Sequence, residues 1–488
     1  MEQKEFFTSR WGLILATLGI AVGTGNIWRF SRIVAQNGGG SFLIPWVLFL
    51  LLWSVPLIIA EMAIGKYARL GPTGAFAKVA GKKFGWMGAF ITFVSTAIMF
   101  YYSVVTGWCF RYFFSAISGD LFNTTSHLEY WETFSSSSWP MLFHFSAIAV
   151  GVFVVYHGIV HGVEKANKIL VPTLIAILLV LLIRALTLPN AFEGIKYFFT
   201  PKMEYLLDIK VWLNALTQNA WDTGAGWGLI LTYAVYAKRK EDISINAALV
   251  GFGNNSISLI AGIIIFSTVF SLSSVDAMAR ITESGPANTG LTFIFLPVLF
   301  SKLSESNLLN IFFASSFFLA LAFAAISSLI SMIELTTRTV IDFGISRKKA
   351  VFMVGFTGLI MGIPSALSMK FFVNQDWVWG VGLILSGAFI AFAIIKFGVD
   401  KFRQEIINGY GSDIKIGKWY NSLIKYVIPI EATVLLVWWL VSSVSWDPDW
   451  WNPLHAENVG TCLLQWGVVL SLLIIFNKTI VNKILQEE

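Results

Sequence analysis

The sequence predicts an all-α integral membrane protein with twelve transmembrane helices. Of its 488 residues, 56% are apolar and 13% are charged, a balance that one water-soluble core cannot bury. The apolar residues gather in runs close to the roughly 20 residues that cross a bilayer. The formal charge of +6 is dispersed through short loops, which indicates membrane orientation rather than a nucleic-acid partner. The runs lie at 11–34, 41–64, 87–117, 140–160, 168–188, 211–237, 246–271, 307–333, 350–368, 377–397, 422–444 and 460–480.

Basic residues mark alternate connections between these runs. Connections rich in Lys and Arg at 66–83, 165–168, 238–240, 347–349 and 401–418 are assigned to the cytoplasm, while the opposite connections carry acids such as Asp120, Glu129 and Asp447. Both termini are therefore expected in the cytoplasm. Two outer connections, 118–139 and 272–306, are long, and the second is compatible with either a capping helical hairpin or a solvated loop.

A glycine motif is repeated in the first and sixth runs. GIAVGTGNIW (19–28) contains Gly23 and Gly25, and WDTGAGWG (221–228) contains Gly224 and Gly226. Both motifs are expected to break a helix in mid-membrane, although glycine pairs also permit close helix packing. Because five runs separate the two copies, the second copy enters from the opposite side, which predicts an inverted repeat. The expected organisation is an N-terminal segment at 1–10, repeats at 11–188 and 211–400, and two peripheral helices with a short tail at 421–488.

Broken helices in a bilayer indicate a binding site. Unwound backbone leaves N–H and C=O groups unpaired, at several kcal/mol each, unless a ligand, an ion or cavity water satisfies them. Half-helix N-termini attract a carboxylate, whereas freed carbonyl oxygens attract a cation. A zwitterion bound together with sodium satisfies both the half-helix N-termini and the freed carbonyl oxygens.

Polar side chains at the same depth favour sodium. Hard oxygen donors lie in runs one, six, seven and eight, at Asn26, Asp222, Asn254, Ser327 and Ser328. Each one singly is also compatible with an interhelical hydrogen bond. Asp222 and Glu61 are ionisable groups at a depth where a charge costs at least about 3 kcal/mol, which makes them functional candidates. Glu61 is also compatible with bracing unwound backbone, and Asp222 with a protonated structural carboxyl.

Four motifs resemble the neurotransmitter:sodium symporter family, including its bacterial amino-acid transporters, over nearly the whole chain. They are RWGLILATLGIAVGTGNIWRF with NGGGSFLIP (10–45), PLIIAEMAIGKY (56–67), FYYSVVTGW (100–108) and FAAISSLISMIE (323–334). The resemblance implies two inverted five-helix repeats with broken helices one and six, plus two peripheral helices. It also implies a multi-pass protein of a prokaryotic cell membrane that imports a small molecule with sodium by alternating access.

Two sodium sites are carried over from the family motifs. The first would use the carbonyl of Ala21, with Asn26, Asp222, Asn254 and the carboxylate of the substrate. The second would use carbonyls of Gly19, Val22 and Ala324 with the hydroxyls of Ser327 and Ser328. No organic cofactor is expected.

The resemblance places the substrate between the two breaks. The residues assigned to it are Ala21, Gly23, Thr24, Gly25, Ile98, Tyr102, Trp221, Asp222, Gly224, Trp227, Ser328 and Met332. Family members that carry amines without a carboxylate have Asp at the position of Gly23, so glycine here favours an amino acid. The two tryptophans and the space left by Gly224 favour an apolar or aromatic side chain.

The chain departs from the family pattern at Asp222, where Ser or Thr is usual beside the chloride of chloride-dependent members. Ser258 fills a position where some bacterial members keep a carboxylate. Asp222 is therefore expected to supply that negative charge from the other side of the site. The prediction is transport without a chloride requirement.

Gates are also inferred from the resemblance. Arg29 over Trp221 resembles an outer gate, with Asp376 as its acidic partner if one gap is allowed, or Gln375 if none is. Lys4 with Asp342, near Tyr236, resembles an inner gate. Gly162 and Pro172 resemble a pair that lets the fifth helix unwind inwardly.

Other functions fit the sequence less well. A channel would need a continuous polar stripe, whereas bulky Tyr102, Trp221 and Trp227 crowd the centre, and a sensor would need an added soluble domain. An enzyme is not expected, because no catalytic triad, phosphate-cradling loop or metal motif stands out. A carrier of betaine or another osmolyte remains an alternative. Oligomeric state is not indicated.

Overall fold

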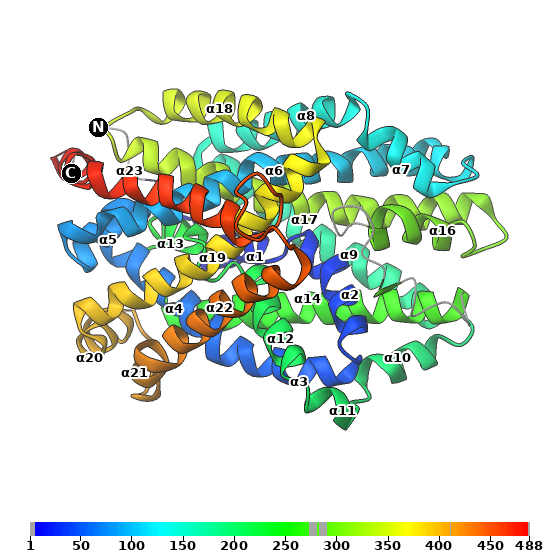
Figure 1. The fold of residues 1–488 in the computed structure, drawn as a ribbon, viewed down its shortest axis with the longest axis horizontal. Coiled ribbons are helices and arrows are strands. Elements are labelled where there is room, and N and C mark those ends of the chain that lie inside the picture. Colours follow the sequence, from blue (N-terminus) through cyan, green and yellow to red (C-terminus); the bar gives the residue numbers. More distant parts are fainter. Residues whose placement is uncertain (1–4, 273–280, 283–289, 410, 487–488) are drawn as a thin grey trace.

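The computed structural model describes residues 5–272, 281–282, 290–409 and 411–486, and within these ranges the chain forms helices and no strands. Most of the long helices run side by side along the long axis of the molecule (Figure 1). The first half contains α1 (Arg10–Ala21), α2 (Thr24–Gln36), α3 (Gly40–Phe49), α4 (Val55–Ala68), α5 (Pro72–Val79), α6 (Gly85–Ser118), α7 (His127–Ser135), α8 (Trp139–Tyr156), α9 (Lys165–Leu186), α10 (Ala191–Phe199) and α11 (Met203–Leu206).

The second half repeats this pattern of long helices and short connecting ones. It contains α12 (Ile209–Asp222), α13 (Leu229–Ala234), α14 (Ile243–Leu272), α16 (Leu296–Phe300), α17 (Asn307–Ile341), α18 (Arg347–Leu367), α19 (Met369–Phe397), α20 (Val399–Phe402), α21 (Trp419–Ser422), α22 (Ile428–Trp446) and α23 (Val459–Gln486). Single turns of π-helix or 3₁₀-helix join them at η1 (Leu50–Ser54), η2 (Lys82–Phe84), η3 (Asp120–Phe122), η4 (Ile159–Glu164), η6 (Leu291–Phe295), η7 (Arg403–Ile407) and η8 (Leu423–Val427).

The predicted fold class is confirmed. Over the described residues, ten helices are long and apolar enough to cross a membrane, and the bent pair α1–α2 forms an eleventh crossing. The remaining predicted run, 211–237, is divided into α12 and the six-residue α13, so it lacks one helix of spanning length. Each of the twelve runs thus corresponds to helical structure, with two of them broken where the glycine motifs lie.

Burial separates central helices from peripheral ones. In the most apolar window of α17, 83% of the residues are buried, and in that of α6 78%, against 17% in α23 and 28% in the span that contains α22. An apolar residue left exposed on such a helix faces lipid rather than water. Hence α6 and α17 form the core beside the breaks, while α22 and α23 are peripheral, as expected, and the spans of α8 and α9, with 33% and 28% buried, also lie toward the outside.

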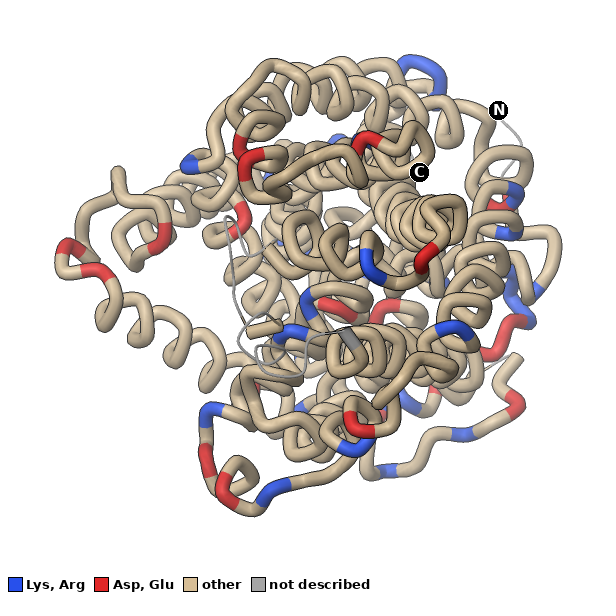
Figure 2. Tube along the Cα trace, turned by 90° about the vertical axis from the view of Figure 1, so that its right-hand side faces the viewer, with Lys and Arg blue, Asp and Glu red and all other residues tan. Residues whose placement is uncertain are grey.

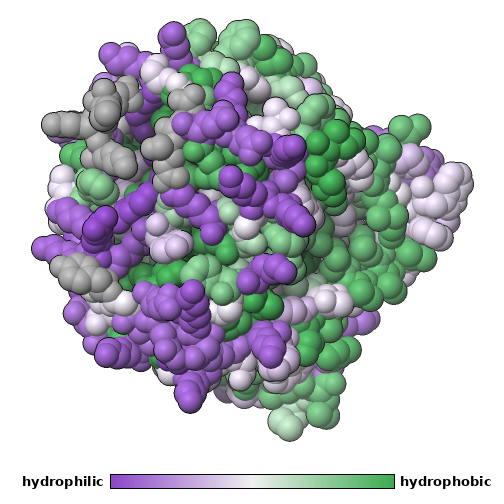
Figure 3. All heavy atoms as spheres, turned by 90° about the vertical axis from the view of Figure 1, so that its left-hand side faces the viewer, coloured by the Kyte–Doolittle hydropathy of each residue, from purple (hydrophilic) through white to green (hydrophobic). Residues whose placement is uncertain are grey.

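The two ends of the bundle differ from its flanks. The last turns of α23 lie at the same end as α5 and α20, on the left of Figure 1. Figure 3 views that end and shows hydrophilic side chains gathered over it, with hydrophobic ones on its flank. Figure 2 views the opposite end and shows Lys, Arg, Asp and Glu scattered among mostly uncharged residues. Residues 273–280 and 283–289 of the predicted hairpin at 272–306 lie outside the described residues, and η6 and α16 belong to its described part.

Candidate functional site

The first break separates α1 from α2, which meet at an angle of 47°. Val22 has an extended conformation, and the N–H of Gly23 donates to Oδ1 of Asn26 at 2.8 Å. A side-chain oxygen that accepts from backbone N–H at a helix start stabilises that start, so Asn26 caps α2. The carbonyls at the end of α1 lie beside this cap.

The second break lies between α12 and α13. Gly224, Gly226 and Gly228 have φ values of 69°, 90° and 77°, which glycine adopts without steric cost. The fully buried carboxylate of Glu61 accepts from the N–H of Gly226 at 2.5 Å and from that of Leu231 at 3.0 Å. Glu61 of α4 therefore holds the unwound backbone of the sixth run in place.

A cavity of about 650 Å³ lies between the two breaks. It extends toward the end of the bundle opposite the last turns of α23, which the sequence analysis predicts to be the outer end. Every residue that the sequence analysis assigned to the substrate lies on its wall: Ala21, Gly23, Thr24, Gly25, Ile98, Tyr102, Trp221, Asp222, Gly224, Trp227, Ser328 and Met332. The wall continues outward through Arg29, Arg32, Gln36, Asn214, Phe372, Asp376, Trp377, Trp439, Trp446 and Glu457. The chamber thus joins the broken helices to the outer end.

Two glycines leave room for the polar groups at the chamber floor. A Cβ on Gly23 would lie 3.3 Å from the hydroxyls of both Ser328 and Tyr102, and a Cβ on Gly25 would lie 2.5 Å from a carboxylate oxygen of Asp222. The Tyr102 hydroxyl also accepts from the N–H of Thr24 at 3.4 Å. The small residues therefore keep the main chain and these side chains in direct contact with the cavity.

Three oxygen atoms converge at the predicted first sodium site. Oδ1 of Asn254 lies 2.9 Å from the carbonyl oxygen of Ala21 and 3.3 Å from that of Asp222. Turning this amide would let it donate to both carbonyls, but would set its nitrogen 2.7 Å from Nδ2 of Asn26 and its oxygen 3.2 Å from Oδ1 of Asn255. Unturned, it accepts from Asn26 and donates to Asn255. Oxygens that face one another this closely suit a hard cation.

The Asp222 side chain stands beside this oxygen cluster. One carboxylate oxygen accepts from Nε2 of Gln218, and the other lies against Gly25. Ser258 is on the far side of the cluster, where its hydroxyl accepts from Asn26 at 2.9 Å. The chain thus has a carboxylate on the α12 side and a neutral hydroxyl on the α14 side.

The residues of the predicted second sodium site lie together where α1 crosses α17. The Ser328 hydroxyl is 3.4 Å from the Gly19 carbonyl and 3.3 Å from that of Ile20, and Ser327 donates to the Ala324 carbonyl at 3.0 Å. These atoms are buried together with Val22. The long contacts of Ser328 leave both its oxygen and the α1 carbonyls able to bind a cation.

The outer part of the cavity contains the predicted gate. The Arg29 guanidinium lies 3.6 Å above the centre of the Trp221 ring, a favourable cation–π geometry. Asp376 is on the same cavity wall, whereas Gln375 accepts from Nε1 of Trp379 and bonds to Asn374. Of the two alignments, the structure therefore brings Asp376 to the cavity. In the described ranges no ion pair joins Arg29 to Asp376.

An aromatic stack that the sequence analysis missed extends this gate outward. The Trp221 ring stacks on Trp439 of α22 at 5.4 Å between centroids, and Trp439 contacts Trp377 and Trp446. Trp439 was overlooked because α22 lies outside the repeats, and one tryptophan among 20 carries no signal of its own.

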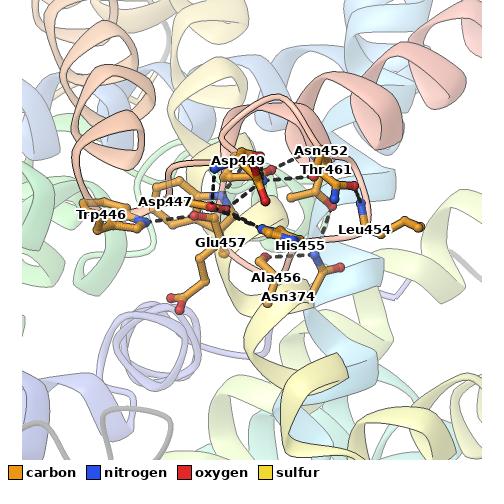
Figure 4. Close-up of polar contacts among 12 residues, drawn as sticks. Asn374, Trp446, Asp447, Asp449, Asn452, Leu454, His455, Ala456, Glu457 and Thr461 are labelled. Carbon is orange, nitrogen blue, oxygen red and sulfur yellow. Dashed lines mark hydrogen bonds and ion pairs between the residues drawn. The ribbon is translucent and has the colours of Figure 1, made fainter.

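The connection after α22 forms a network of polar contacts beside Trp446, one member of the stack (Figure 4). Its centre is Asp447, which accepts from His455 at 3.0 Å and from Asn458 at 2.9 Å. Although burial favours the neutral acid, hydrogen bonds from Asn458 and His455 hold the pKa of Asp447 below its ordinary value. These hydrogen bonds within the connection hold its backbone in one conformation.

The same connection is joined to the stack through indole N–H groups. Nε1 of Trp446 donates to the Glu457 carbonyl at 2.9 Å, and Nε1 of Trp377 donates to the Asn458 carbonyl at 3.2 Å. Figure 4 shows the Glu457 side chain pointing away from this network, and Glu457 lines the outer cavity. The outer rim is thus acidic and aromatic.

The predicted inner gate can be described only in part, because Lys4 lies outside the described residues. Asp342 accepts from Arg338 at 2.7 Å and from the N–H of Gly71 at 2.6 Å. Tyr236 donates to Glu334 at 2.6 Å, and Glu334 also pairs with Arg347 at 2.5 Å. The sequence analysis did not single out Glu334, which is fully buried.

The predicted hinge residues of the fifth run lie next to the N-terminal segment. Gly162 is part of the π-helical turn η4, and Pro172 lies inside α9. Glu164, at the end of η4, accepts from both the N–H and the hydroxyl of Thr8, at 2.8 and 2.5 Å. This corner therefore joins α9 to the start of α1.

Comparison with known proteins identifies the family. The chain matches the model of the sodium:neurotransmitter symporter family over residues 4–138 and 132–486. It is 33% identical to an uncharacterized sodium-dependent transporter of Methanocaldococcus jannaschii over 449 residues, covering 89% of this chain and 90% of that protein. It is 28% identical to the sodium-dependent serotonin transporter of Drosophila melanogaster, covering 92% and 79%.

A solved structure agrees with the fold. The crystal structure of MhsT in complex with L-phenylalanine superposes with a TM-score of 0.78 at 30% identity, covering 89% of this chain and 99% of that one. The broken α1–α2 pair, the central cavity and these matches lead to one conclusion. The chain belongs to the sodium:neurotransmitter symporter family and is a multi-pass, sodium-dependent membrane transporter.

Proposed function

We propose that this chain imports a small apolar or aromatic amino acid together with two sodium ions, without a chloride requirement. The observation that carries the proposal is the convergence of Ala21, Asp222 and Asn254 oxygens beside Gly23. A cation held by these oxygens leaves one side open to the cavity. A substrate carboxylate can approach from that side because residue 23 has no side chain.

The cavity wall supports an amino acid with an apolar side chain. The hydroxyl of Tyr102 and the start of α2 provide donors for a carboxylate, and the partial positive charge of a helix N-terminus favours the same group. Ile98, Trp227 and Met332 present apolar surface on the same wall. The structural relative MhsT was crystallised with L-phenylalanine, which favours this substrate class for the present chain.

The position of Asp222 supports independence from chloride. Its carboxylate lies against Gly25, next to the proposed first sodium site, whereas Ser258 on the opposite side is neutral. A fixed negative charge next to this site balances the charge of a sodium ion as a bound chloride would. Transport by this chain then does not require chloride.

Alternating access follows from the two ends of the cavity. Arg29 and the Trp221 ring can close over a bound substrate from the outer side, because both already line the passage. Release on the other side requires the contacts of Thr8 and Tyr236 to separate. We place both termini in the cytoplasm, which makes the outer cavity extracellular.

Two sodium ions provide enough free energy for strong accumulation. Each ion contributes about 2.3 kcal/mol per 100 mV of membrane potential, and a tenfold gradient adds about 1.4 kcal/mol. Two ions give about 7 kcal/mol, or roughly a hundred-thousandfold accumulation, whereas one ion gives only a few hundredfold. The steady-state accumulation ratio therefore tests the proposed stoichiometry.

The experiment is uptake into proteoliposomes with an inward sodium gradient and choline as the matched control. We expect saturable uptake of one or more apolar or aromatic amino acids, unchanged when gluconate replaces chloride. Uptake of glycine betaine alone would favour the osmolyte carrier instead, and sodium current without saturable uptake would favour a channel. Uptake that disappears without chloride would remove the role given to Asp222, for which Asp222→Asn should create a chloride requirement.

A further inference from the structure

Asn167 of α9 lies against the proposed second sodium site, although no family motif indicated it. A Cβ built on Gly19 would lie 2.2 Å from Oδ1 of Asn167 and 3.2 Å from Cβ of Ser327. The amide oxygen is therefore packed against the main chain of α1, on the side where α1 meets α17. Asn167 is fully buried.

The two ends of this amide are used differently. Nδ2 donates to the Val163 carbonyl, one turn earlier in the chain, at 2.9 Å. Oδ1 has no hydrogen-bond partner among the described residues. Turning the amide would set its oxygen against the Val163 carbonyl, so the observed orientation is the favourable one. An unpaired acceptor at this depth lacks the solvation it would have in water and favours a partner.

The residues around Oδ1 belong to the proposed second sodium site. Gly19 and Ser327 are both members of the proposed second sodium site. The neighbouring cation, Lys168, is bound to Glu164 at 2.7 Å and has 42% of its side chain exposed, so it points away from this buried corner. A neutral amide oxygen without a donor is a suitable ligand for a hard monovalent cation.

We propose that Oδ1 of Asn167 is an additional ligand of the second sodium site, contributed by α9. The inference rests on the proposed function, since it assumes that sodium binds between α1 and α17. It adds a third helix to that site. It also couples sodium binding to the contacts at the inner end of the molecule, because Glu164, three residues earlier, accepts hydrogen bonds from Thr8.

The test measures sodium binding by its effect on thermal unfolding of the purified full-length protein, with choline keeping the ionic strength constant. Asn167→Leu removes the oxygen at similar volume. We expect it to raise the half-effective sodium concentration about tenfold, the size of one lost hydrogen bond or ligand contact to a charge. Asn167→Asp keeps the oxygen and adds charge, so sodium should bind at least as tightly as in the parent.

Two further variants make the test interpretable. Ser327→Ala removes a proposed ligand of the same site and should also weaken sodium binding. Thr17→Val is the matched control, because the Thr17 hydroxyl is fully buried on α1 but bonds to the carbonyls of its own helix. We expect Thr17→Val to leave the half-effective sodium concentration unchanged.

The outcomes separate this inference from the proposed function. If Ser327→Ala weakens sodium binding and Asn167→Leu behaves like Thr17→Val, Asn167 is not a ligand and the proposed second site stands. If the parent shows no sodium-dependent stabilisation, both proposals are wrong. Should Asn167→Leu fail to fold, Asn167→Ala and Asn167→Asp carry the same comparison. Sodium binding that stays equal to the parent in Asn167→Ala would overturn the proposal.

Discussion

The two ends of the transport path use similar residues in opposite states. At the inner end, acids and bases are in direct contact: Glu334 with Arg347 at 2.5 Å, and Asp342 with Arg338 at 2.7 Å. At the outer end, Arg29 lies on the Trp221 ring, while Asp376 stands elsewhere on the wall of an open chamber.

The comparison shows how one fold can be closed on one side only. The Glu334–Arg347 pair joins α17 to α18, while Thr8 of the N-terminal segment donates to Glu164 of η4 and accepts from Lys238. The outer gate residues are held by stacking, which allows sliding more readily than a bidentate ion pair does. The described conformation is therefore sealed at the end that carries the last turn of α23 and hollow at the other.

The largest effect is expected from Glu334→Ala. It removes the buried carboxylate partner of Arg347, whose own side chain is 14% exposed and also donates to the Val155 carbonyl. Breaking a mostly buried pair costs up to about 3–5 kcal/mol, which favours opening of the inner end. A cysteine at Ala234, 4% exposed in the crevice beside Leu13, reports this opening by its rate of alkylation. Both native cysteines are buried, which keeps the background low.

Asp400→Asn is the matched control for this experiment. Asp400 pairs with Arg403 at 2.7 Å, but 52% of its side chain is exposed. Such surface pairs contribute little, so alkylation at position 234 should match the parent. Equal alkylation in Glu334→Ala and Asp400→Asn would mean that the inner pairs do not hold that end closed.

A smaller effect is expected at the outer end from Trp439→Ala. The stacked Trp221–Trp439 pair contributes about 0.5–1.5 kcal/mol beyond its buried area, so substrate affinity should fall roughly two- to tenfold. Equilibrium binding of radiolabelled substrate measures the change. Trp450→Ala is the control, since Trp450 is 42% exposed on the adjoining connection; an equal loss in both variants would remove the role of the stack.

The smallest effect concerns pH at the outer rim. Burial, and then the charge of Asp376, raise the pKa of Glu457 above its ordinary 4.5. A raised carboxyl pKa means that the structured state binds the proton more tightly, so the rim becomes more stable as pH falls through this pKa. Protonation also removes a negative charge that repels Asp376 on the outer cavity wall, which favours outer closure.

The measurement for Glu457 is the pH dependence of substrate dissociation from the outer side. Between pH 7 and pH 5, we expect dissociation to slow in the parent and to be independent of pH in Glu457→Gln. A slope that persists in Glu457→Gln would assign the titration to another group. Asp447 does not interfere in this range, because its pKa lies below the ordinary value.

Much of the fold and part of the candidate site could be predicted from local sequence. Gly23, Gly25, Gly224 and Gly226 marked the breaks because helix-breaking is a property of a few adjacent residues. The residues assigned to the substrate came from the family resemblance, and they line one cavity because α6 and α17 pack beside the breaks. The choice between Asp376 and Gln375 required the structure, since a one-residue gap in an alignment leaves no trace in composition.

Asn167 and Trp439 could not be predicted for a different reason. The fifth apolar run was expected to begin at residue 168, whereas α9 begins at Lys165, so Asn167 was assigned to a polar connection. Trp439 belongs to a helix outside the repeats. Their roles depend on contacts between segments more than 140 residues apart, such as α9 with α1 and α22 with α12, and no local pattern encodes such contacts.

The hydrogen bonds of Glu61 to the sixth run mean that the two helix breaks are held in place by different contacts. Gly226 and Leu231 are fastened to α4 by a fully buried carboxylate, whereas Gly23 is capped by Asn26 from its own helix. Asn26 in turn donates to Asn254 and Ser258 of α14, so the first break is tied to its neighbour through neutral side chains, whereas the second is tied through a carboxylate. We therefore expect the inner half of the first span to move during transport and α13 to stay fixed relative to α4.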